Sequence, residues 1–171
     1  MIDREYVRLM ARYNAWQNHS LYYAAAGLDA EAREADRGAF WGSIRKTLAH
    51  LAWGDQIWIA RFDGGDGPAM GAMEAFEAYD WETLWSLRPE LDARIAGWAW
   101  SVADDDLKGD LTWHSGFLGA DLTRPKALCV VQLFNHETHH RGQVHAMLTA
   151  AGARPDDTDV PFMPDEVPEW R

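Results

Sequence analysis

The longest regular pattern of apolar and polar positions runs from Thr123 to Gly152. Its apolar side chains recur at the three- to four-residue spacing that defines one face of an α-helix. Thr123 can cap such a helix, Pro125 is tolerated in its first turn, and Gly152 suits its C-terminal end. The pattern therefore predicts one long helix over residues 123–152.

One face of this helix combines core positions with two histidines. At about 100° per residue, eight residues fall within roughly 60° of a common line. They are Cys129, Leu133, His136, His140, Gln143, Val144, Met147 and Ala151. His136 and His140 are four residues apart, so their imidazoles point toward one place, as two ligands of a metal do. A metal would need a third protein ligand from elsewhere; two hydrogen-bonded core histidines are the alternative.

Two other histidines on the predicted helix are less well placed. His139 falls at the edge of the face, and His145 points to the opposite side. Glu137 is about 80° from the common line, at the margin of the face, which is typical of a boundary or surface residue. We therefore expect His140, and not His139, to pair with His136.

Three more long helices are predicted upstream, two of them with a capping side chain at the start. They are Asp3–Gly27, Ser43–Phe62 and Asp80–Ala103. Pro89 is expected to kink or divide the third of these. His50 lies on a flank of the second, and Gly54, one turn later, leaves space beside its imidazole. Taken alone, His50 is more typical of a core or boundary histidine than of a metal ligand.

The remaining segments predict short or irregular structure. Residues 29–36 are charged and fit a short solvated helix, and the glycine-rich residues 63–71 form a loop. Residues 110–123 contain two β-like runs around a glycine turn, which predicts a hairpin before the last helix. Residues 153–171 carry four prolines and should not be helical. Four apolar side chains are expected to pin that tail to the helices: Val160, Phe162, Met163 and Trp170.

Composition narrows the class of protein. The 171 residues, 47% of them apolar, suit a single domain spanning 1–171. A formal net charge of −11 argues against binding nucleic acid or an anionic membrane, because both need a basic surface. A lone cysteine, Cys129, excludes an internal disulfide, and MIDREYVRLM lacks the apolar region of a signal peptide. We therefore expect a cytoplasmic protein.

The run HETHH also matches the H-E-x-x-H helix of zinc proteases, with Glu137 as the general base. The metzincin extension fails, because it needs glycine where Gln143 stands and histidine where Ala146 stands. A thermolysin-like site needs a glutamate downstream, and Glu166 and Glu169 lie in the proline-rich tail. The protease interpretation is therefore not favoured.

A wider match accounts for more of the chain. NHETHHRGQVHAMLTAAG, together with LAHLAWGDQIWIARF and RYNAWQN upstream, resembles the DinB family of DinB/YfiT-like metalloenzymes. Asn135, His136 and the run His140–Gln143 fit the family pattern N-H-x-x-x-H-R-G-Q without a gap. His50 fits the histidine that the family carries early in the second helix. The resemblance covers nearly the whole chain.

The resemblance implies an all-α fold, a four-helix bundle, with the short hairpin before the last helix. It also implies one divalent metal held by His50, His136 and His140, most often zinc or nickel, with manganese or iron as alternatives, and a homodimer. Three imidazoles with an open position describe a catalytic site, since a structural zinc site is closed by a fourth protein ligand. Cys129 cannot readily be that ligand, because it lies about 10 Å of helix rise before His136.

Characterised relatives in this superfamily look like thiol-dependent transferases that use a low-molecular-weight thiol, such as bacillithiol or mycothiol. The resemblance therefore implies a thiol S-transferase in which the metal activates the thiol. Two alternatives stay open: hydrolysis by a water activated at the metal, and a metal-binding dimer without turnover. The sequence identifies neither the substrate, nor the metal, nor a catalytic residue, and leaves open whether Glu137 or His139 takes part in the reaction.

Overall fold

The computed structural model describes residues 1–170, and they form a mostly helical fold with a small antiparallel sheet. The helices and strands have the following bounds: α1 Arg4–Ala26, α2 Ala30–Glu34, α3 Ile44–Asp63, α4 Ala72–Ala78, α5 Trp81–Ser101, β1 Asp110–Ser115, β2 Ala120–Pro125 and α6 Lys126–Ala150. Two short 3₁₀ turns, Asp104–Leu107 and Val160–Phe162, complete the regular structure. No helix among these residues has the length and apolar character needed to cross a membrane.

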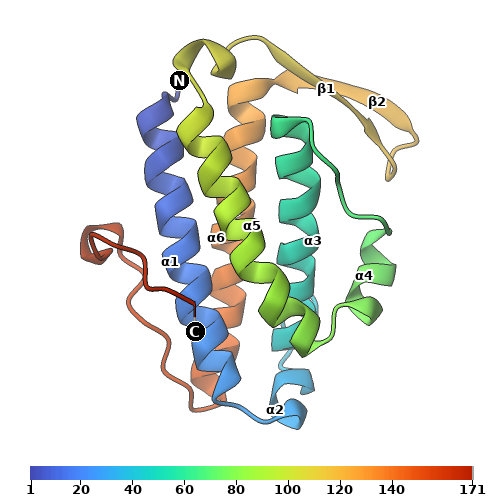
Figure 1. Ribbon diagram of the computed structural model, residues 1–171. Helices are drawn as coiled ribbons and strands as arrows, with labels where there is room; N and C mark the ends of the chain where they lie inside the picture. Colours follow the sequence, from blue (N-terminus) through green and yellow to red (C-terminus); the bar gives the residue numbers. More distant parts are fainter. Residues whose placement is uncertain (171) are drawn as a thin grey trace.

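The four long helices pack side by side, as Figure 1 shows. Each of α1 and α3 contacts both α5 and α6, so the core lies between all four. The hairpin β1–β2 projects from one end, and the C-terminal tail runs back along α1 (Figure 1). Side chains of Asp3, Ser43 and Asp80 accept hydrogen bonds from the first turns of α1, α3 and α5, as N-caps do.

Several sequence predictions are confirmed. The four long helices, the short helix after residue 29, the glycine-rich loop and the hairpin all lie where expected. Gly152 has a φ of 85°, the left-handed conformation that follows a helix C-terminus.

Other predictions are wrong in detail. The last helix begins at Lys126, because Thr123 and Pro125 belong to β2, where the Thr123 hydroxyl bonds that of Thr112 across the strands at 2.8 Å. Helix α5 continues as one element through Pro89. Helix α4 was not predicted, since residues 72–78 give only two turns of periodicity.

The tail is held less by apolar side chains than the sequence suggests. Trp170 packs between rings of α1 and α5, with Tyr22 and Trp85 each less than 6 Å away. Val160 and Phe162 are exposed instead of pinned. Side chains of helix α1 hold the tail by its backbone. The Tyr13 hydroxyl donates a hydrogen bond to the Thr158 carbonyl at 2.7 Å. The side chains of Gln17 and Arg12 donate in the same way to the carbonyls of residues 157 and 165.

The core has three layers along the helix axes. One apolar cluster surrounds Leu48, Leu84 and Val144, and the other surrounds Ile59 and Leu133. Between them, each long helix contributes polar side chains that are nearly or fully buried. They are Asn14, Asn18, Asp55, Arg88, Asp92, Glu137 and Arg141.

Arg88 is the central member of this polar layer. Its guanidinium lies 2.7 Å from the Asp55 carboxylate on α3 and 2.9 Å from the Asp92 carboxylate on its own helix. Asn18 of α1 donates a 2.8 Å hydrogen bond to Asp92. The same layer therefore ties α1, α3 and α5 together by charge and hydrogen bonding.

This arrangement predicts a large stability loss on replacing Arg88 with Met. Removing one member of a buried ion pair leaves uncompensated charge, which costs about 3–5 kcal/mol. The matched control is Arg94→Met on the same helix, whose ion pair with Asp63 is partly exposed and should contribute at most about 1 kcal/mol. Urea unfolding of the three proteins measures the difference, and equal losses would contradict the role given to Arg88.

Candidate metal centre

Helices α3 and α6 bring the three predicted histidines together. Nε2 of His50 lies 2.8 Å from Nε2 of His136, and ligand nitrogens of His50, His136 and His140 all lie within 4.8 Å of one another. Their rings meet edge to face, with centroids 4.5–4.8 Å apart. His50 comes from α3, and the other two come from successive turns of α6. His139, next in sequence to His140, is exposed and outside the cluster.

The surroundings keep these imidazoles neutral. Burial and the two neighbouring histidines lower the pKa of His50 to about 3. Burial also lowers the pKa of His136 and of His140. Trp41 covers one side of His50, with ring centroids 4.5 Å apart, and Phe76 lies beyond it. A neutral imidazole has a free lone pair, which is the form that binds a metal.

A glycine makes room for the cluster, although not where the sequence predicted. A Cβ atom at Gly54 would lie 3.3 Å from Cε1 of His136 and 3.8 Å from its Nδ1. The space on α3 therefore accommodates the ring from α6, and not that of His50 on the same helix. The four-residue spacing between His50 and Gly54 predicted that the space serves the His50 ring. The sequence alone does not show that a ring from a different helix occupies it.

The spacing of the nitrogens suits a divalent metal. A tetrahedral ion with metal–nitrogen distances of about 2.0–2.1 Å separates its ligands by roughly 3.3 Å. The observed spread, from 2.8 Å to 4.8 Å, brackets that value. Three neutral nitrogen donors also match the ligand type that zinc and nickel accept. His50, His136 and His140 could therefore hold the ion, leaving a further position for a substrate atom.

Glu137 is not the boundary residue that the sequence suggested, because its side chain is completely buried. It points into the polar layer, with one carboxylate oxygen 3.8 Å from the Arg141 guanidinium. Its other oxygen lies 3.9 Å from Nδ1 of His136. Burial raises the pKa of Glu137. The mistake arose because α6 packs against both α1 and α3, so its buried arc is wider than one stripe.

The polar layer behind the histidines holds more acids than bases. It contains Asp55, Asp92 and Glu137 against Arg88 and Arg141. Burial, with the nearby Glu137 charge, raises the pKa of Asp55 to about 8, and burial raises that of Asp92 to about 7. With two guanidinium groups for three acids, one carboxyl group of the layer has no cationic partner, and burial favours its protonated form. Sequence analysis missed Arg88 and Asp55, although both fall on apolar stripes of their helices.

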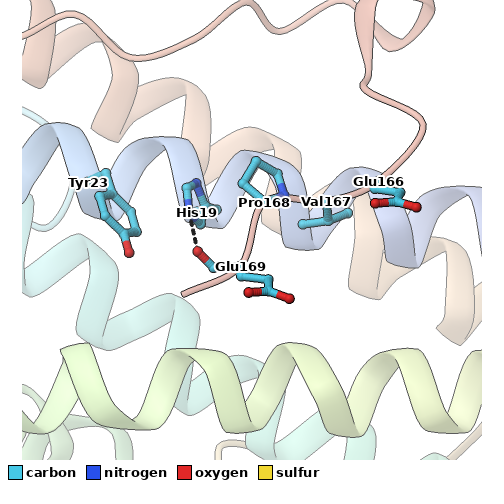
Figure 2. Close-up of a pocket in the computed structure, with 6 residues that line it drawn as sticks. All are labelled: His19, Tyr23, Glu166, Val167, Pro168 and Glu169. Atoms are coloured by element: carbon cyan, nitrogen blue, oxygen red, sulfur yellow. Dashed lines mark hydrogen bonds between the residues drawn. The ribbon is translucent and has the colours of Figure 1, made fainter. Parts of the chain in front are cut away.

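A cavity beside the C-terminal tail lies apart from the histidine cluster. It is a groove of about 430 Å³ between α1 and the tail, lined by His19, Tyr23 and residues 166–169, which Figure 2 shows. His19 is its only histidine, and its Nε2 lies 3.3 Å from the Glu169 carbonyl (Figure 2). None of the three clustered histidines lines the groove.

Comparisons with known proteins agree with this arrangement. The model of the DinB family matches residues 1–171. The chain is 28% identical over 152 residues to the protein DinB of Bacillus subtilis (strain 168), covering 86% of this chain and 87% of the relative. No solved structure gives a significant match.

The contact at Gly54 yields a direct prediction for metal affinity. In Gly54→Ala the new methyl group would press on His136 and turn its ring, so divalent-metal affinity should fall at least about tenfold, as for other losses of ligand orientation. Gly97→Ala is the control, because a Cβ there meets nothing within 4 Å. Competition titration with a chromophoric chelator measures both, and unchanged affinity in Gly54→Ala would show that the ring has room to move.

Proposed function

The chain belongs to the DinB family, and from that membership and the histidine cluster we propose a metal-dependent enzyme that activates a low-molecular-weight thiol for S-transfer. The observation that carries the proposal is the convergence of three neutral imidazole nitrogens within 4.8 Å. The four long helices then correspond to the bundle expected of the family. The homodimer and the cytoplasmic location stay predictions.

The protein's own residues prepare the site for such a reaction. His50, His136 and His140 would hold the ion and leave one side open. When bound, a divalent cation lowers the pKa of a coordinated thiol, so that the thiolate exists at neutral pH. In the transfer, the sulfur forms a bond to an electrophilic carbon, the leaving group departs with the bonding electrons, and the thiol proton passes to solvent. Trp41 and Phe76 shield His50 from water on one side.

The placement of Glu137 supports thiol transfer over a zinc-protease reaction. A general base must reach the proton that it removes, within hydrogen-bonding distance or through one water. Glu137 is fully buried beside Arg141, on the Nδ1 side of His136, where its carboxylate is closed off from solvent. A reaction whose nucleophile is activated by the metal needs no carboxylate at that position.

The first test measures metal binding. We expect one divalent ion per chain by elemental analysis of protein purified without chelator, and by titration of the metal-free form. His140→Ala should abolish tight binding, because it removes a ligand. The matched control, His139→Ala, should reduce affinity less than tenfold, since His139 lies outside the cluster. Absence of tight binding in the unaltered protein, or the reverse order of the two variants, would overturn the site.

The second test concerns Glu137 and the reaction. The metal-loaded protein is assayed with several thiols and electrophiles, and any active pair is used to compare variants. Glu137→Gln should keep its metal and at least a tenth of that activity, because burial already favours the uncharged form that glutamine imitates. His50→Ala should lose both. A Glu137→Gln protein that binds metal normally but has no activity would favour hydrolysis instead.

A further inference from the structure

Gln143 contacts the outer edge of the histidine cluster. Its side-chain oxygen, Oε1, lies 2.8 Å from Nδ1 of His140. Its side-chain nitrogen, Nε2, lies 3.4 Å from Nε2 of His139. The residue sits three positions after His140 on α6, so the two side chains share one face of the helix. Gln143 thus touches a predicted ligand without belonging to the cluster.

The donor and acceptor roles in this contact follow from the amide. An amide oxygen can only accept a hydrogen bond, so Nδ1 of His140 must carry the proton. A neutral imidazole has one protonated nitrogen, and Nε2 of His140 is therefore left with a free lone pair. With the amide reversed, its NH₂ group would require a bare Nδ1, and the proton would move to Nε2. Only the observed orientation leaves His140 able to bind a metal through Nε2.

The other two histidines lack such a partner. Nδ1 of His50 and Nδ1 of His136 are both buried without a hydrogen bond in the described part of the chain. Their rings are held by packing, on Trp41 in one case and against Gly54 in the other. Among the three histidines, His140 is therefore the member whose outer ring nitrogen, Nδ1, has a side-chain partner in the described part of the chain.

We propose that Gln143 is a positioning residue that holds His140 in its Nδ1–H form and so directs the Nε2 lone pair toward the metal. The proposal rests on the proposed function for its metal, but the proton position is a property of the metal-free protein. Partners of this kind, which bond the outer nitrogen of a ligating histidine, change metal affinity by 10- to 100-fold when removed.

The test compares two substitutions of Gln143, one that removes the hydrogen-bond acceptor and one that keeps it. Gln143→Leu removes the acceptor at similar size, whereas Gln143→Glu keeps an oxygen within the same reach. We expect divalent-metal affinity to fall about 10- to 100-fold in Gln143→Leu and to stay within about threefold in Gln143→Glu. His139→Ala, which removes only the other contact of Gln143, is the control. Thermal unfolding of each metal-free variant shows whether it is folded.

A second readout follows the proton itself. Long-range ¹⁵N–¹H spectra of histidine-labelled, metal-free protein report which ring nitrogen of His140 is protonated. We expect the Nδ1–H form in the unaltered protein and in Gln143→Glu, and a shift toward the Nε2–H form in Gln143→Leu.

Each outcome bears on the proposal. Loss of affinity in Gln143→Leu alone, together with the change in proton position, would support it. Unchanged affinity in Gln143→Leu, or equal losses in both variants with the proton unmoved, would overturn it. If the unaltered protein binds no metal, the proposed function fails, and the spectra alone then decide: a shift confined to Gln143→Leu supports the role of Gln143, and no shift refutes it.

Discussion

The buried ion pairs of Arg88 are the interaction on which the rest of the structure depends. A guanidinium between the carboxylates of Asp55 and Asp92 is surrounded by two apolar clusters, so neither charge can be left alone without a large cost in free energy. The four long helices must meet at the heights that keep this layer intact. Such a layer favours one axial register of the helices, because a shift along the axes would leave buried charges without their partners.

The histidine cluster gains its geometry from that register. His50 lies five residues before Asp55 on α3, and His136 directly precedes Glu137 on α6. Fixing Asp55 and Glu137 within the layer therefore fixes the heights at which the imidazoles meet. His50 and His136 stay partly exposed, whereas Asp55 and Glu137 are fully buried and anchor their helices in the core. Stability and ligand geometry are thus carried by different residues of the same two helices.

Much of this arrangement was predictable from the sequence, for reasons that differ between elements. The sequence placed His136 and His140 on one face of α6, because the regular period of a 25-residue helix fixes the direction in which each side chain points. The pairing of His50 with them came from the family pattern, since helical phase alone says nothing about which helices touch. Glu137 was misplaced because contact with two neighbours widens the buried arc, a tertiary effect. Arg88 was missed although it stands between Leu84 and Ile95 on an apolar stripe, where a charge signals a buried partner.

The way in which the tail is held has a consequence for how its sequence can vary. Gln17 and Tyr13 donate to the carbonyls of Asp157 and Thr158, and Arg12 donates to those of Pro164 and Asp165. Every residue type offers the same carbonyl, so the information for this docking lies in α1 and not in the tail. The side chains at these four tail positions can therefore vary in sequence without loss of the hydrogen bonds. Replacement of a donor side chain on α1, in contrast, removes the hydrogen bond that fixes the backbone there. Related sequences should accordingly preserve the three donor side chains of α1 better than the side chains of the tail segment that they hold.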